Sequence, residues 1–115
     1  MTIGGNSGLG QRIPGLFPSN GKVLIYYSID GTQRQFWSPA IPLNEWVHFK
    51  FTQHLEDSKY VFRSYMDHRL LKIEENKKPE EFKQVDIWLS DNWYNTQPGF
   101  VKNLFITGTY ETENR

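Results

Sequence analysis

Apolar and polar residues alternate in several short runs of this chain, and this two-residue period constrains the fold more than any other feature. In the clearest run, residues 84–90, every second side chain is apolar: Val85, Ile87 and Leu89. Successive side chains of a β-strand point to opposite faces, so the pattern predicts a strand that buries one face. Trp88 falls on the other face. A second strand is expected at 99–106, after a polar aromatic loop.

Turn dipeptides separate the alternating runs. Asn20-Gly21 and Asp30-Gly31 stand on either side of residues 22–29, and both pairs favour tight hairpin turns. Further strands are expected at 12–17, 33–38, 45–53, 60–65 and 69–73. Strand signals at roughly ten-residue spacing, without sustained helical periodicity, predict an antiparallel sandwich or barrel.

Two details of this pattern carry their own expectations. Pro14 has no backbone N–H for a ladder, so the strand at 12–17 should be an edge strand or contain a bulge. The charged residues at 74–81 surround Pro79, and we expect them to form a solvated loop or one short helical turn.

Length and charge limit what the protein can be. At 115 residues the chain is one domain, with a flexible Gly-rich lead-in at 1–11, a β-sandwich at 12–110 and a tail at 111–115. Lys plus Arg and Asp plus Glu number 13 each, so no overall field attracts nucleic acid. No apolar run is long enough to span a membrane. The N-terminus also lacks the charged and apolar regions of a signal peptide.

Residue types and spacings argue against catalysis. The chain has no cysteine, which excludes thiolate nucleophiles and cysteine-based zinc sites. His48, His54 and His68 show no metal-binding spacing, and no serine lies in a nucleophile-elbow context. The sequence therefore predicts a protein that is not an enzyme.

Several segments, in order, resemble a known family. Residues 44–49 resemble a strand that begins with tryptophan, 60–70 a hairpin, and 85–106 a closing pair of strands. Together they resemble the concanavalin A-like jelly rolls of laminin-G and pentraxin-like modules, over residues 12–107. The resemblance implies an antiparallel two-sheet jelly-roll sandwich, an extracellular location, and binding of glycans or proteins.

The resemblance also carries two further implications. Related glycosidases place their carboxylates as Glu-x-Asp-x-x-Glu on one strand, and this chain has no such spacing. Modules of this kind carry two or three more strands before the position of Thr2. The resemblance then implies a reduced sandwich, a fragment, or a partner chain or second copy that supplies these strands by adding to an open sheet edge.

The candidate site lies in the polar aromatic loop. Sugar rings stack on Trp or Tyr while Asn and Asp bond the hydroxyls, so we expect carbohydrate binding there. The expected ligand-binding residues are Trp88, Asp91, Asn92, Trp93, Tyr94 and Asn95. The alternative is that the aromatic residues pack inside the sandwich. A structural or protein-interaction domain that self-assembles is the rival function.

No cofactor is required by the sequence, but the resemblance implies that Ca²⁺ could bind at a loop rim. A hard cation takes oxygen ligands, and Asp91 and Asp30 are the candidates, with Asn92 and Asn95 beside Asp91. The alternative is that these residues simply form turns.

Overall fold

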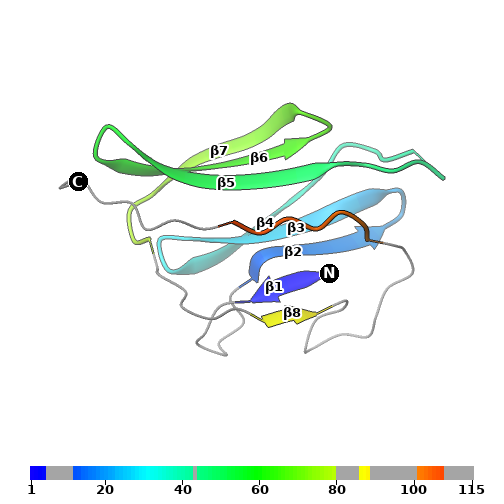
Figure 1. Cartoon of the computed structure of the whole chain (residues 1–115), viewed down its shortest axis with the longest axis horizontal. Coiled ribbons are helices and arrows are strands. Elements are labelled where there is room, and N and C mark those ends of the chain that lie inside the picture. The colour runs from blue at the N-terminus through cyan, green and yellow to red at the C-terminus, as the bar shows by residue number, and fades with distance from the viewer. Residues whose placement is uncertain (5–11, 43, 80–85, 89–100, 108–115) are drawn as a thin grey trace.

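The computed structural model describes residues 1–4, 12–42, 44–79, 86–88 and 101–107 of the chain. Over these residues the protein is all-β, and they contain no helix (Figure 1). The strands are β1 (Thr2–Gly4), β2 (Arg12–Ser19), β3 (Lys22–Ile29), β4 (Thr32–Trp37), β5 (Phe49–Glu56), β6 (Lys59–Met66), β7 (Arg69–Asn76) and β8 (Asp86–Trp88).

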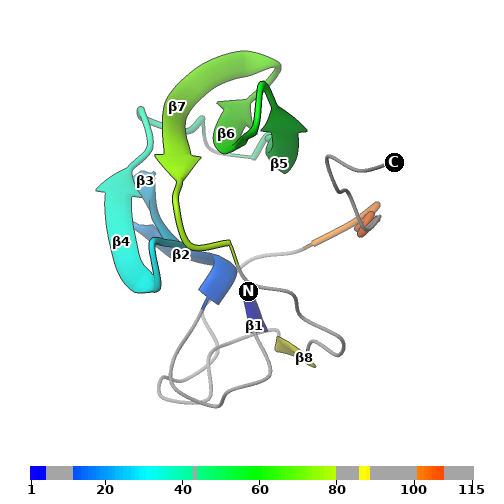
Figure 2. The same cartoon turned by 90° about the vertical axis from the view of Figure 1, so that its left-hand side faces the viewer.

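The strands form two antiparallel sheets. Sheet A has the order β4-β3-β2-β1-β8, and sheet B has the order β5-β6-β7. Most neighbours are joined by hairpins, but β1 and β8 pair across the length of the sequence, with Ile3 opposite Ile87. The two sheets lie over one another, and β7 passes closest to β3 (Figure 2). The predicted all-β, antiparallel architecture is therefore confirmed, in a sandwich-like arrangement.

The hairpins of sheet A turn where the sequence predicts. Asn20 and Gly21 have φ of 50° and 74°, and Asp30 and Gly31 have φ of 55° and 70°. Two consecutive positive φ angles define the turn whose twist matches that of paired strands. Glycine adopts this backbone conformation without the clash that a Cβ atom causes.

The hairpins of sheet B use the same geometry without glycine. Asp57 and Ser58 have φ of 48° and 68°, and Asp67 and His68 have φ of 48° and 67°. Both turns were expected from the sequence, but each places a residue with a side chain where glycine is preferred. The second turn is held by its own contacts: the His48 N–H donates to Asp67 Oδ1 at 2.9 Å, and the Asp67 N–H donates to the His48 carbonyl at 2.8 Å.

Pro14 lies in the interior of sheet A, because β2 runs between β1 and β3. The predicted edge position is therefore wrong, whereas the alternative, a bulge, agrees with the structure. The pairing of β1 with β2 shifts register between Thr2, opposite Gly15, and Gly4, opposite Arg12. An irregular ladder at this point tolerates a residue that has no N–H to contribute.

The side chain of Arg12 passes over Gly15 and leaves no room for a Cβ atom there. A Cβ atom at this position would lie 2.7 Å from Arg12 Cδ. The Arg12 guanidinium sits 4.5 Å from the ring centroid of Tyr26, and the Tyr26 ring meets Phe17 edge-on at 5.4 Å. This cluster covers the face of sheet A that points away from sheet B, and Arg12 itself is buried.

Three parts of the strand pattern differ clearly from the sequence prediction. β5 begins at Phe49 rather than at residue 45, because the backbone of His48 bonds the turn at Asp67. β7 continues to Asn76, so Glu74 belongs to a strand and the predicted loop is wrong there. Residues 101–107 form no strand, which contradicts the strand expected at 99–106.

The hydrophobic core is supplied mainly by β3. Val23, Ile25, Tyr27 and Ile29 alternate along this strand, and all four are buried. From sheet B only Phe62 is a buried hydrophobic residue among the described part of the chain. The core is therefore built on one strand of sheet A. The part of the chain that the structure describes also contains no helix with the length and hydropathy of a membrane span.

Candidate ligand-binding cleft between the two sheets

Aromatic rings join the two sheets. The ring of Tyr27 on β3 lies parallel to that of Phe62 on β6, with centroids 4.8 Å apart. Phe51 on β5 extends this row at 6.4 Å from Phe62, and Phe36 on β4 meets Tyr27 edge-on at 5.8 Å. Each aromatic pair adds to the stability gained by burial. The contact thus fixes the spacing of the sheets at one point.

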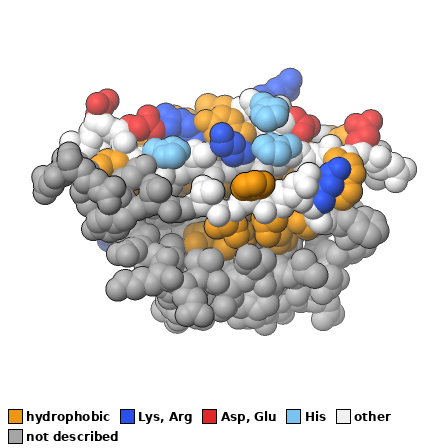
Figure 3. All heavy atoms as spheres, in the orientation of Figure 1, with side chains coloured by type: hydrophobic (Ala, Val, Ile, Leu, Met, Phe, Trp, Pro, Cys, Tyr) orange, Lys and Arg blue, Asp and Glu red, His pale blue; other side chains and the backbone are white. Residues whose placement is uncertain are grey.

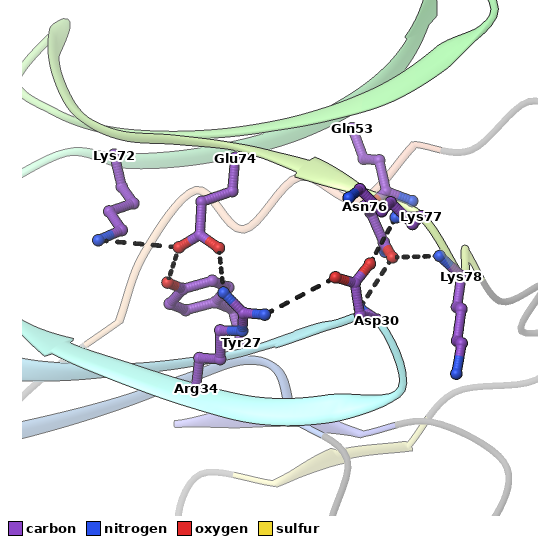
Figure 4. Close-up of polar contacts among 9 residues, drawn as sticks. All are labelled: Tyr27, Asp30, Arg34, Gln53, Lys72, Glu74, Asn76, Lys77 and Lys78. Carbon is purple, nitrogen blue, oxygen red and sulfur yellow. Dashed lines mark hydrogen bonds and ion pairs between the residues drawn. The ribbon is translucent and has the colours of Figure 1, made fainter.

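A charged cluster links β4 to β7 beside this aromatic contact. Glu74 reaches from β7 toward sheet A and accepts a hydrogen bond from the Tyr27 hydroxyl (Figure 4). Its second carboxylate oxygen accepts from Arg34 Nη1 at 2.7 Å. Lys72 Nζ lies 3.7 Å from the first oxygen, the one that Tyr27 bonds. Burial, together with the bond to the Glu74 carboxylate, raises the pKa of Tyr27 well above its ordinary value.

A second polar group continues this link at the β3–β4 turn. Asp30 Oδ1 accepts from the backbone N–H of Lys77 at 2.5 Å, and Asn76 Oδ1 accepts from the N–H of Asp30 at 2.9 Å (Figure 4). Asn76 Nδ2 donates to Gln53 Oε1 at 3.0 Å. The side chain of Asn76 therefore ties β5 and β7 to the turn of sheet A.

A cleft of about 220 Å³ opens beside the aromatic row. Its walls come from both sheets: from β2 and β3 on one side, and from β5 and β6 on the other. The lining residues are Ile13, Pro14, Tyr27, Ser28, Phe51, Thr52, Gln53 and Phe62. None of these side chains carries a charge at neutral pH, and most of the surface is apolar. Small-molecule sites are typically of this kind, concave and apolar with a few polar groups.

Two of the lining residues have side chains with unused hydrogen-bonding capacity. The Ser28 hydroxyl is buried and has no hydrogen-bond partner. Gln53 uses its side-chain oxygen to accept from Asn76, and no described residue accepts from its NH₂ group. Strand alternation, however, directs the Ser28 side chain to the face of β3 opposite Tyr27, so its hydroxyl does not point into the cleft.

The residues predicted as a glycan site are only partly within the described structure. Trp88 is the last residue of β8, the edge strand of sheet A, and its backbone pairs with Thr2. Asp91, Asn92, Trp93, Tyr94 and Asn95 lie outside the described residues, so the predicted ligand-binding set stays a prediction.

Asp30, the other predicted metal ligand, has a structural position. Its carboxylate accepts from Lys77 and lies 3.7 Å from Arg34 Nη2. One of its oxygens therefore accepts a hydrogen bond and the other faces a guanidinium. Among the described residues, no group of three or more His, Asp or Glu side chains is arranged to hold a metal ion.

The outward face of sheet B carries charged groups and histidines (Figure 3). The His48 and His68 rings stack with centroids 5.0 Å apart. Across the same sheet Arg63 forms a two-pronged ion pair with Glu56, and this hydrogen bonding lowers the pKa of the Glu56 carboxyl. The pair is partly exposed to solvent, so it contributes little to stability.

Sequence reasoning did not find the cleft. Its residues come from four strands, and no motif brings them together. The alternation of 22–29 does place Tyr27 with the buried residues, and the alternation of 60–65 places Phe62 on one face. These signals identify each wall separately but not which walls face each other.

The comparisons with known proteins identify no relative. No family model matches the chain, and neither a curated protein nor a solved structure does.

Proposed function

We propose that this protein is a non-enzymatic recognition module with a concanavalin A-like jelly-roll fold, and that carbohydrate is its leading ligand. The pairing of β8 with β1 supports the fold proposal, because it closes sheet A with a strand from far along the sequence. Returns of this kind are typical of jelly-roll connectivity. An extracellular location is part of the same proposal, through the resemblance.

The position of β8 is the observation that carries the binding proposal. The strand lies at the edge of sheet A and ends at Trp88, so the aromatic loop segment begins at a sheet edge. Residues at such rims are common positions for binding groups, since a rigid sheet holds them. In the proposed mechanism Trp93 and Tyr94 stack on a sugar ring. The polar side chains of Asp91, Asn92 and Asn95 bond its hydroxyl groups.

A glycan array tests this proposal directly. The wild-type protein should bind at least one glycan class, and Trp93→Ala should lose that binding. Trp46→Ala is a matched control, because Trp46 is an exposed tryptophan that precedes β5 on the other sheet. The array is repeated with calcium and with a chelator to test Asp30 and Asp91 as ligands. Failure of the wild-type protein to bind any glycan would reject carbohydrate as the ligand.

Self-association is the second candidate function, and one observation favours it. Residues 101–107 carry apolar side chains that are exposed: Phe105 at 88%, Val101 at 51%, Ile106 at 50% and Leu104 at 45%. An exposed apolar group of this kind is a candidate contact surface. Light scattering after size-exclusion chromatography should then show a dimer or larger species, and Phe105→Ser should shift it toward the monomer. A monomer at all concentrations would reject this candidate.

A further inference from the structure

We propose that this protein forms a two-fold dimer in which Phe105 of each copy inserts into the cleft between the two sheets of the other copy. The inference rests on the self-association proposed above and names the surface that receives the segment 101–107. It joins two features of the described structure: an apolar cleft, and an aromatic side chain that its own chain leaves uncovered.

The segment 101–107 exposes a contiguous apolar group. Phe105 is 88% exposed, whereas isolated apolar residues at a surface are normal and a contiguous group marks a contact site. The sole charged residue of the segment is Lys102, and its Nζ lies 4.2 Å from the ring centroid of Trp46. The segment therefore offers an uncharged aromatic group to a partner. The other apolar residues of the segment are about half exposed: Val101, Leu104 and Ile106.

The cleft matches this aromatic group in size and chemistry. A dry protein cavity of about 150 Å³ holds one benzene molecule. At about 220 Å³ the cleft has room for a phenylalanine ring and the methylene group that carries it. Pro14, Phe51 and Phe62 line the cleft from both sheets, and none of the lining side chains carries a charge at neutral pH. An inserted ring would therefore leave water without separating any ion pair.

Gln53 supplies a polar contact for the backbone of the inserted segment. Its Oε1 accepts from Asn76, and no described residue accepts from its NH₂ group. Gln53 is exposed, so water can bond this group in the monomer. A backbone carbonyl beside the inserted ring can replace that water, which keeps the donor paired when the cleft is covered.

The segment and the cleft lie on the same side of the molecule. Figure 2 shows 101–107 on the side of β5, while β4 and β7 lie on the opposite side. The described lining of the cleft comes from β2, β3, β5 and β6, so the cleft belongs to the side that carries the segment. When a protruding group and a complementary hollow share one side, a two-fold axis can pair each with its counterpart on a second copy.

The size of this contact predicts a weak dimer. A buried aromatic side chain removes about 150–250 Å² from water. Two inserted rings, the walls that they cover and the neighbouring apolar side chains would bury roughly 1,000 Å² in total, at the lower limit of specific interfaces. The dimer should therefore dissociate on dilution.

Sedimentation equilibrium of the full chain, from micromolar to millimolar concentration, measures this association. The wild-type protein should show a reversible monomer–dimer equilibrium. Phe105→Ser should raise the dissociation constant at least about 30-fold, as expected for a residue at the centre of an interface. Leu70→Ser is the control, because Leu70 is an exposed apolar residue near the start of β7, and it should change the constant less than about twofold.

Gln53→Glu tests the cleft itself. The substitution keeps an acceptor for Asn76, but it replaces the NH₂ donor with a charge that an inserted apolar ring would strip of water. We expect the dissociation constant to rise about tenfold. Gln33→Glu is the matched control, because Gln33 is an exposed glutamine on β4 and the substitution changes the net charge equally.

Isotope-filtered NMR on a mixture of labelled and unlabelled chains should link the Phe105 ring of one copy to Phe51 and Phe62 of the other. Contacts that occur only within one chain would show that the segment closes its own cleft, and would overturn the proposal, as would the absence of such contacts. A dimer that Phe105→Ser weakens and Gln53→Glu does not would overturn the cleft as the contact and leave self-association standing. A protein that stays monomeric at millimolar concentration would reject both.

Discussion

Sheets A and B each contain a three-stranded meander, but the two meanders are stabilised differently. In sheet A the hairpins turn at glycine, and β3 places Ile25 and Ile29 fully out of solvent. In sheet B the turns use Ser58 and His68 in a conformation that favours glycine. Among the described residues, Phe62 is the buried hydrophobic residue that sheet B contributes to the core.

The inner face of sheet B is polar along β7. Glu74 and Asn76 on β7 bond Tyr27 and the β3–β4 turn of sheet A, and Lys72 pairs with Glu74 on the same strand. A polar inner face contributes less burial than an apolar one and depends more on correct pairing. Most of the buried hydrophobic residues in the described part of the chain therefore belong to sheet A. Sheet B is attached to it by an aromatic stack, a charged cluster and the bonds of Asn76 and Lys77 to the β3–β4 turn, and the cleft lies beside them.

The largest effect should come from removing the aromatic attachment. Phe62→Ala deletes the ring that stacks on Tyr27, and we expect the free energy of unfolding to fall by about 3–5 kcal/mol. Val61→Ala is the control, because the neighbouring side chain points to the outer face and should lose only about 1 kcal/mol. Urea unfolding monitored by tryptophan fluorescence measures both. Equal losses would show that the sheets are held together elsewhere.

The hairpins of both sheets could be predicted from the sequence because their causes are local. Alternation sets the strand faces, and dipeptides such as Asn20-Gly21 set the turns. The start of β5 could not be predicted in this way. Alternation continues through His48, whose carbonyl still accepts from the Asp67 N–H, but the His48 N–H donates to the Asp67 side chain instead of to a backbone carbonyl. That competition involves a residue 19 positions away, which the local pattern does not show.

Removing the charged cluster around Glu74 should have the second largest effect on stability. Glu74→Ala removes the acceptor shared by Tyr27, Arg34 and Lys72, and leaves the Tyr27 hydroxyl without its partner. We expect a loss of about 2–3 kcal/mol, since the carboxylate is mostly buried and bonded from three sides. Glu75→Ala is a matched control from the opposite face of β7. A similarly small loss in both variants would mean that the cluster does not join the sheets.

The candidate site was harder to predict than the fold. Trp88 and the residues that follow it were chosen because of their types, and their role still depends on the tests above. The cleft depends on which faces of β3 and β6 meet, and no short motif encodes this. Glu74 shows the difficulty most clearly: its charge suggested a solvated loop, yet it bonds Tyr27 inside the contact.

The hydrogen bond between Tyr27 and Glu74 should also make the stability of the protein sensitive to alkaline pH. The pKa of Tyr27 is raised in the folded state above the ordinary value of 10.0, so the fold favours the neutral phenol. The stabilisation linked to this raised pKa is fully present below about pH 10 and is lost progressively as the pH rises above 10. Tyr27→Phe should cost about 1–2 kcal/mol at pH 7. Above pH 10 the difference in the free energy of unfolding between the wild type and Tyr27→Phe should narrow by up to about 1.4 kcal/mol per pH unit.

Denaturant curves at pH 7, 9, 10 and 11 measure this narrowing. The comparison of the two proteins cancels the titration of the other tyrosines, which both share. If the difference in the free energy of unfolding stays constant up to pH 11, the Tyr27 hydroxyl is not held neutral by Glu74. The attachment at this point would then be aromatic packing alone.

The smallest effect should come from the turns of sheet B. Ser58 has a φ of 68°, where a Cβ atom is strained, and glycine at the same position of the sheet A turns avoids that strain. Ser58→Gly should therefore stabilise the protein by about 0.5–1 kcal/mol, even though glycine gains more freedom in the unfolded chain. Gly31→Ser makes the reverse change in sheet A, at a φ of 70°, and should destabilise by a similar amount. Thermal unfolding of both variants measures the two shifts. If both substitutions destabilise, the side chain of Ser58 contributes something to its turn that glycine cannot supply, and the two sheets differ in more than backbone strain.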